Sequence, residues 1–464
     1  MTGLEDALWS YRTGLLPAGD PLVTVLEELA GRRRDHLLPA VGLVDVRTGR
    51  VARPCDLEVA DGRIVKRGPA AACRWYALPG LVDAHAHVSS AADQAGLLVY
   101  GVTGYRQMWG EPAHRYAAGV HRARHAVLPR PWVASGVVDG PGSRVPAAVT
   151  VVDGPRAVRH VVNEALAFGF DGIKIYDDLA EPEFTALIGA ARRVGLPVVG
   201  HVPERVPLAV ALREMWSTEH LYGLVPNVFR LPPAARWPAL AKALDRRETQ
   251  LDTLAKQFAG CWVCPTLTAW RARTGERRYT RPSAAALRTA AGGRRRAWGA
   301  AAREALGTTE AVARERGELV DRLGRLVRVL AENGARLLVG TDCGNPFVVA
   351  GPSFHKELAE LSRAGLGLAA ILTAATTAAH QALRPDERDP ADLVLYRRLP
   401  AEVADLARPD AVLVDGVLLD GADLDRLWAL RLADAGLEPA DWPRGRLDAV
   451  VAGAPPKREV TSAS

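Results

Sequence analysis

The chain has 464 residues, of which 48% are hydrophobic and 24% are charged, and its formal net charge is +6. Such a composition is ordinary for a soluble globular protein, and so small a charge on so long a chain gives no indication of a nucleic-acid partner. No run is long and apolar enough to span a membrane, and we expect no secretion signal at the start. Five cysteines, an odd number, predict no disulfide framework, which favours a cytoplasmic location.

Residues 1–36 show helical periodicity and predict a short helical extension. From 37 to 79 the pattern changes to short alternating strands and turns, with Asp61-Gly62 as a hairpin signal. Strand-like runs return within 383–425, in "ADLVLYRR" and "DAVLVDGVLL". We expect the last stretch, 426–464, to be a helical or disordered tail, because its end is polar.

Between these flanks, 80–382 alternates strand-like runs with helical stretches. The eight strand candidates are "LVDAHAH", "VYGVTGYRQ", "PWVASGVV", "DGIKIY", "LPVVGHV", "MWSTEHL", "CWVCPTL" and "ARLLVGTD". Eight strands, each followed by a helical stretch, predict an α/β protein built on a (β/α)8 barrel.

Two features inside the barrel segment are open to more than one interpretation. Residues 271–330 form an Arg-rich helical insertion, which is either a solvated outer layer or a lid or docking surface. Cys261 and Cys264 have the spacing of a redox or metal motif. Positions i and i+3 of a strand face opposite ways, however, so plain strand packing is the favoured interpretation.

Polar residues recur at the predicted carboxyl ends of the strands, where barrel active sites are built. In "DAHAH", His85 and His87 are two residues apart and point the same way from one strand. The other strand ends carry Lys174, His201, His220 and Asp342. Four imidazoles, a carboxylate and a lysine that converge on one rim predict a binuclear metal site.

These motifs resemble the amidohydrolase superfamily, and within it the imidazolonepropionase and prolidase-like (Xaa-Pro dipeptidase-like) group. "LPGLVDAHAHV" resembles the opening metal motif, and "DGIKIYDDLAEPEFTALIGAARRVGLPVVGHVP" resembles the stretch from the lysine strand to the next histidine. "STEHL" and "LLVGTDCG" match the remaining motifs. The resemblance covers roughly 40–395. It implies a composite β-sandwich built from 37–79 and 383–425.

By this resemblance the metal ligands are His85, His87, Lys174, His201, His220 and Asp342. The family implies two divalent metal ions, with zinc the expected identity, and a carbamylated lysine as an anionic bridge between them. Lys174 is one of only six lysines, and it lies between two isoleucines. Only a neutral amine can form a carbamate, which a guanidinium cannot do. Asp342 would act as general base and then general acid in hydrolysis.

Four further positions are weaker candidates for substrate contacts: Tyr105, Arg106, Tyr176 and His355. Packing is an equally good explanation for the two tyrosines and for Arg106. The family's usual sequence after the barrel is reduced here to "RPDERDPADLVLY", which predicts a trimmed or rearranged sandwich.

We therefore expect a metal-dependent hydrolase of a non-ester C–N bond in a small-molecule or peptide-like substrate. A dipeptidase, a hydrolase of cyclic amides and a processing enzyme for a bottromycin-type modified peptide all remain open. A mononuclear deaminase of a nucleobase-like ring is disfavoured, because such enzymes do not need the lysine at 174. A barrel kept only for binding is disfavoured, because all six ligand positions are intact. The sequence leaves the oligomeric state open, including a homo-oligomer.

Overall fold

The computed structural model describes residues 21–32, 35–60, 63–115, 127–143, 149–248, 250–277, 279, 303–304, 307–383 and 392–434. Much of the Arg-rich insertion and most of the tail lie outside these ranges. The N-terminal extension is represented by helix α2 (Pro21–Ala30), and the beginning of the tail by helix α17 (Gly421–Asp434).

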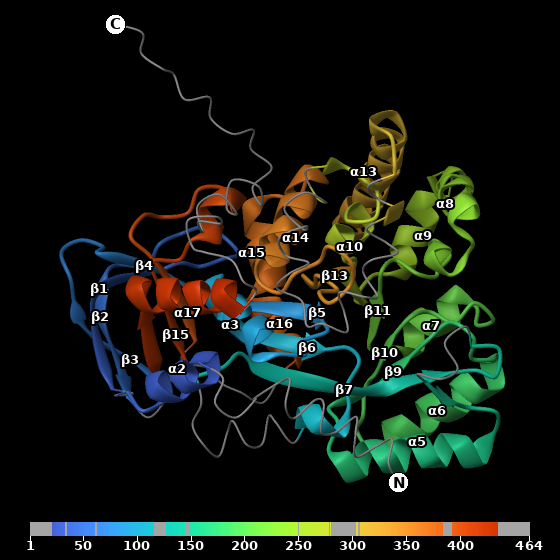
Figure 1. Ribbon diagram of the computed structural model, residues 1–464, viewed down its shortest axis with the longest axis horizontal. Coiled ribbons are helices and arrows are strands. Elements are labelled where there is room, and N and C mark those ends of the chain that lie inside the picture. The colour runs from blue at the N-terminus through green and yellow to red at the C-terminus, as the bar shows by residue number, and fades with distance from the viewer. Residues whose placement is uncertain are drawn as a thin grey trace, which may run out of the picture.

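The centre of the molecule is a curled sheet of eight parallel strands (Figure 1). In spatial order these are β5 (Leu81–Ala86), β6 (Val102–Gln107), β7 (Arg130–Asp139), β9 (Gly172–Ile175), β10 (Val198–Gly200), β11 (Ser217–Glu219), β12 (Trp262–Cys264) and β13 (Arg336–Leu337). A short strand, β8 (Thr150–Val151), pairs with β7. Each of the eight predicted barrel strands is present, and their order in space follows their order in the sequence.

Backbone hydrogen bonds join the last strand segment to the first. Ala84 donates its amide to the carbonyl of Val339 at 2.7 Å, and Asp342 donates its amide to the carbonyl of His85 at 2.7 Å. The sheet thereby closes next to the histidine motif, and the predicted amidohydrolase-type barrel is confirmed.

Helices follow the strands and cover the outside of the barrel (Figure 1). They are α3 (Ala91–Val99), α5 (Pro155–Phe168), α6 (Glu181–Arg193), α7 (Leu208–Glu214), α8 (Pro233–Glu248), α9 (Leu251–Gln257), α10 (Leu267–Arg271), α13 (Glu310–Glu332), α14 (Pro352–Arg363), α15 (Leu368–Ala375) and α16 (Thr377–Leu383). Helix α13 shows why they pack there. Its N-cap, Thr309, accepts from the amide of Val312, and residues such as Val320, Leu323 and Val327 form one buried stripe at helical spacing.

A second sheet of seven strands lies to one side of the barrel, on the left in Figure 1. Its order is β16-β15-β14-β4-β1-β2-β3, with β1 (His36–Leu43), β2 (Cys55–Ala60), β3 (Arg63–Pro69), β4 (Trp75–Pro79), β14 (Leu393–Tyr396), β15 (Ala411–Val414) and β16 (Val417–Asp420). We expected a composite β-sandwich from both flanks of the barrel, and the structure has an additional sheet there, in which strands of both flanks form one continuous sheet. Strand β14 pairs antiparallel with β4, which leads directly into β5. This pairing ties the sheet to the strand that carries His85.

Helices α2, α3 and α17 pack together against β15 and β16, and their apolar side chains form one buried cluster. Within the part of the chain that the structure describes, no helix combines the length and apolar character needed to cross a bilayer. The two cysteines of the CxxC motif diverge. Cys261 lies near the carbonyl of Leu212, 3.3 Å away, whereas Cys264 is fully buried on β12 beside Glu219 and His85.

Candidate metal centre

The barrel brings the six predicted ligands to one rim. His85 belongs to β5 and Lys174 to β9. His87, His201 and His220 directly follow β5, β10 and β11, and Asp342 lies a few residues beyond the end of β13. Five of the six are less than a tenth exposed, and His87 is intermediate. Since the strands are parallel, their carboxyl ends all open at this rim.

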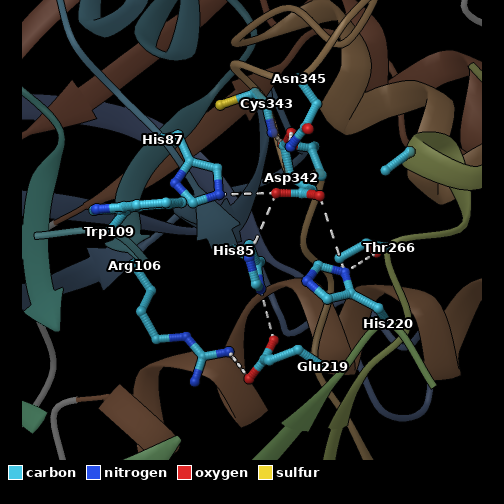
Figure 2. A network of polar contacts seen from close by, with 12 residues as sticks. His85, His87, Arg106, Trp109, Glu219, His220, Thr266, Asp342, Cys343 and Asn345 are labelled. Atoms are coloured by element: carbon cyan, nitrogen blue, oxygen red, sulfur yellow. Dashed lines mark hydrogen bonds and ion pairs between the residues drawn. The ribbon is translucent and has the colours of Figure 1, made fainter. Parts of the chain in front are cut away.

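Asp342 lies at the middle of the cluster (Figure 2). Its Oδ1 lies 2.9 Å from Nε2 of His87 and 3.5 Å from Nε2 of His85, and its Oδ2 lies 4.0 Å from Nδ1 of His220. Ligand atoms of His85, His87 and Asp342 all lie within 4.8 Å of one another. Three such atoms at this spacing can share one metal ion.

The imidazole rings of His220 and His201 extend the cluster, because the ring of His220 contacts those of both His85 and His201. The centroid of the His220 ring lies 4.5 Å from that of His85 and 5.1 Å from that of His201. Nε2 of His85 and Nε2 of His201 are buried and have no hydrogen-bond partner among the residues that the structure describes. Because buried polar nitrogens are normally satisfied, these two atoms fit the role of metal ligands.

The other nitrogen of three rings is held by a neighbouring side chain. His85 donates from Nδ1 to Glu219 at 2.7 Å, and His201 donates from Nδ1 to Asp177 at 2.8 Å. Nδ1 of His220 lies 2.7 Å from the hydroxyl of Thr266. Metal-bound histidines are typically fixed in this way through their second nitrogen. The donor set therefore fits a divalent metal centre.

The electrostatics favour the neutral form of His85 and His220 and the charged form of Asp342. Burial, followed by the nearby Lys174, lowers the pKa of His85 to about 4, and burial lowers the pKa of His220 well below its usual value. Burial alone would raise the pKa of Asp342, but the imidazoles, His220 foremost, outweigh it and hold that pKa well below its usual range. These are the protonation states that metal ligands need.

Lys174 is 1% exposed, and burial lowers the pKa of its amine to about 8. The charges of the Asp342 and Glu219 carboxylates raise this pKa and that of Arg106 lowers it further, but burial is the largest effect. A neutral amine is thus accessible near neutral pH, as carbamate formation requires.

Strained backbone marks the same rim. His220, Leu221, Thr266 and Asp342 all have positive φ angles, between 50° and 62°. Left-handed backbone is costly for residues other than glycine, particularly for a β-branched residue such as Thr266. Strain of this kind persists where the surrounding structure fixes it, and it gathers at functional sites.

Arg106 and Glu219 form a buried ion pair below the cluster (Figure 2). Arg106 is fully buried and donates to the carbonyl of Ala84, to Oγ of Ser217 and, at 2.7 Å, to Oε1 of Glu219. Burial would raise the pKa of Glu219, but Arg106 and then His85 outweigh it, so the pKa is lowered. The structure thus places Arg106, a candidate substrate contact, behind His85 with its guanidinium closed off from solvent.

The other weaker candidates are placed differently from one another. Tyr176 stacks on His201 with ring centroids 4.1 Å apart, so it lies at the cluster. Tyr105 is buried in the main hydrophobic core. His355 lies on α14 away from the cluster, where its Nε2 donates to the carbonyl of Tyr100 at 2.9 Å. Of these three, the structure therefore brings only Tyr176 to the predicted metal ligands.

Sequence reasoning missed three residues that contact the predicted ligands: Glu219, Asp177 and Thr266. Glu219 immediately precedes His220, and Asp177 follows Tyr176, so both stand in the motifs already quoted. Arg230 was also missed, although its Nε binds Asp177 at 2.6 Å and its guanidinium lies 5.4 Å from the ring centroid of Tyr176. No spacing rule links Arg230 or Thr266 to a histidine far away in the sequence.

Replacing Thr266 with valine is expected to weaken the binding of a divalent metal ion by about 10- to 100-fold, the usual effect of losing a group that orients a ligand. Valine keeps the β-branched shape in the same strained backbone but removes the hydroxyl beside His220. Competition with a chromophoric chelator measures the dissociation constant. Thr266→Ser, which keeps the hydroxyl, should restore tight binding, and an unchanged constant in Thr266→Val would refute the role.

The comparisons with known proteins agree with this geometry. No protein-family model matches the chain, and a search of curated proteins likewise finds no match. Among solved structures, a bottromycin amidohydrolase is 62% identical, with a TM-score of 0.90 over 95% of this chain and 99% of that one. The chain belongs to the amidohydrolase superfamily. It is a metal-dependent amidohydrolase, as its sequence motifs predicted.

More distant superfamily members share the fold. A putative prolidase from Bifidobacterium longum is 19% identical, with a TM-score of 0.60 over 86% of this chain and 98% of that one. A Xaa-Pro dipeptidase with bound methionine in its active site is 18% identical, with a TM-score of 0.59 over 83% of this chain and all of that one. The resemblance to the prolidase-like group is thereby confirmed at the level of fold.

Proposed function

We propose that this amidohydrolase cleaves a peptide-like C–N bond in the maturation of a ribosomal peptide of the bottromycin type. The 62% identity to a bottromycin amidohydrolase, which spans nearly the full length of both chains, carries the proposal. A peptide substrate is also compatible with a centre at the carboxyl ends of the barrel strands, where the active sites of this fold are built.

The ligand set supports two divalent metal ions, with zinc as the expected identity. His85 and His87 would hold one ion, and His201 and His220 the other. Asp342 lies against His85 and His87. Nitrogen and carboxylate ligands of this kind suit zinc.

Lys174 would bridge the two ions as a carbamate. The ammonium first loses one proton to solvent. The neutral amine then attacks carbon dioxide, a new N–C bond forms and one C=O π bond breaks, and a second proton leaves the nitrogen to solvent, so that an anionic carbamate replaces the ammonium. Removing the positive charge from a site that is 1% exposed, and adding an anion beside two cations, is favourable on both counts.

When bound, the metal ions supply a nucleophile at neutral pH by acidifying water, and they polarise the scissile carbonyl. Asp342 accepts the proton of the attacking water and passes it to the leaving nitrogen. Its pKa, held well below the usual range by His220 and its neighbours, keeps it ionised for the first step. Glu219, Asp177 and Thr266 hold the imidazoles in place throughout.

The purified chain, reconstituted with zinc and bicarbonate, should hydrolyse modified peptides that carry a flanking segment. Mass spectrometry of a panel of such peptides, linear dipeptides and lactams measures which bond is cut. If the protein hydrolyses lactams and none of the peptides, the peptide proposal is wrong and the protein is a cyclic-amide hydrolase.

Carbamylation has a test of its own. With 13C-bicarbonate, the zinc-loaded protein should show a carbamate resonance by NMR. Lys174→Met should abolish this resonance and should lower the zinc content of the protein by at least half. Lys356→Met is the matched control, because burial also lowers the pKa of Lys356 to about 8 but no histidine ligand adjoins it. Full activity of Lys174→Met with one metal per chain would instead favour a mononuclear deaminase.

A further inference from the structure

Helix α10 begins directly after Thr266, and its first backbone amides need acceptors from outside the helix. The residue that precedes a helix often supplies one of them through its side chain. At the start of α3, Ser90 accepts from the amide of Asp93. At the start of α13, Thr309 accepts from the amide of Val312. Thr266 makes no such bond to α10, although threonine is well suited to the role.

The hydroxyl of Thr266 is turned to the histidine cluster instead (Figure 2). Its Oγ1 lies 2.7 Å from Nδ1 of His220. The backbone of Thr266 is left-handed, with φ 50° and ψ 46°, whereas a residue that caps a helix normally has an extended backbone. The side chain of Thr266 therefore serves His220, and the first turn of α10 must be capped by another group.

Glu357 of α14 supplies the missing acceptors. Its Oε1 accepts from the amide of Leu267 at 2.9 Å, and its Oε2 accepts from the amide of Thr268 at 2.6 Å. These are the first two amides of α10, so one carboxyl group caps the helix from outside. Helices α10 and α14 pack against each other, and Ala269 and Leu358 from the two helices belong to the same buried core.

Glu357 is fully buried, and these two amides are its hydrogen-bond partners. Within the described part of the chain, no ion pair joins it to a cation. Glu360, one turn further along α14, is also buried, but it binds the guanidinium of Arg271 at 2.8 Å. Burying a carboxyl group without a cation costs free energy. The two amides, and not a salt bridge, therefore account for the place of Glu357.

We propose that Glu357 is a positioning residue for His220, because by capping α10 it leaves the hydroxyl of Thr266 available to hold the imidazole. Without Glu357, two buried amides lose their acceptors, which is costly. The hydroxyl of Thr266 is the acceptor that a helix normally uses at this position, and recruiting it to α10 would release Nδ1 of His220. The proposal rests on the proposed function only in taking His220 as a metal ligand.

The first test uses the metal-free full chain labelled with 15N-histidine. NMR reports on Nδ1 of His220, whose resonance is assigned by its loss in His220→Asn. Glu357→Met keeps an unbranched side chain of similar length but has no acceptor oxygen. We expect it to move the His220 resonance in the same direction as Thr266→Val does. Glu357→Gln, which keeps one acceptor oxygen, should move it less. An unmoved resonance in Glu357→Met would overturn the proposal.

Glu360→Met is the matched control. It makes the same substitution at a second buried carboxylate of α14, which contacts the last residue of α10, Arg271. A general loss of packing or stability would be shared by the two variants. We expect Glu360→Met to leave the His220 resonance where it is in the parent chain. If both variants move it equally, the effect comes from packing and the positioning role is refuted.

Chelator competition with zinc then measures the coupling to metal binding. Glu357→Met should weaken zinc binding by about tenfold in the parent chain, but by no more than about twofold in a Thr266→Val background, because its effect passes through the hydroxyl. Equal losses in both backgrounds would overturn this route. His220→Asn is read separately. If it binds zinc as tightly as the parent, the proposed two-ion centre fails, whereas the resonance still decides whether Glu357 positions His220.

Discussion

Glu219→Ala should lower the free energy of unfolding of the metal-free protein by about 3–5 kcal/mol, the range for breaking a buried ion pair. Glu219 is fully buried and binds Arg106 and Nδ1 of His85, each at 2.7 Å. Its removal leaves the guanidinium of Arg106 buried without a counter-charge and His85 without its acceptor. Urea denaturation followed by circular dichroism measures the first effect, and chelator competition measures the loss of zinc affinity.

A double variant separates stability from metal positioning. Arg106→Met/Glu219→Leu removes both charges and fills the space with apolar side chains, so stability should return to within about 2 kcal/mol of the parent. Zinc affinity should remain at least tenfold below that of the parent, because no acceptor then holds His85 Nδ1. A double variant that binds zinc as tightly as the parent would show that Glu219 serves stability alone.

The strand ends were predictable because the barrel obeys local rules. Alternation in "LVDAHAH" places His85 and His87 on one side of a strand, and parallel strands present their carboxyl ends at one rim. Lys174 could be singled out from its sequence neighbours alone. A lysine between two buried isoleucines is costly to bury as an ammonium, which indicates a functional role for the amine. The eight strands and the convergence of the ligands follow from such short-range patterns.

The groups that orient the ligands could not be predicted in the same way. Arg106 reaches Glu219 across 113 positions of sequence, and His220 reaches Thr266 across 46. Such pairings depend on the curvature and register of the closed barrel, which no local pattern encodes. The sequence interpretation of Arg106 as a candidate substrate contact shows the consequence, because an arginine at a strand end is equally suited to an interior ion pair.

Asp342→Asn should lower kcat by about a thousandfold or more, within the range for loss of a positioned general acid–base group together with some loss of metal affinity. Asparagine is the informative replacement because Asp342 has a φ of 60°, and Asn tolerates left-handed backbone far better than most residues. An Asp342→Ala variant would add backbone strain to the loss of the carboxylate.

The amide of the variant keeps an oxygen near His87 and His85 but cannot accept a proton and pass it on. The assay is therefore run with excess zinc, and metal content is measured on the same samples. A variant that holds a full complement of zinc and still loses about a thousandfold in kcat assigns the proton transfer to Asp342. A zinc-loaded variant that keeps more than a tenth of the parent's kcat would leave Asp342 as a metal ligand only.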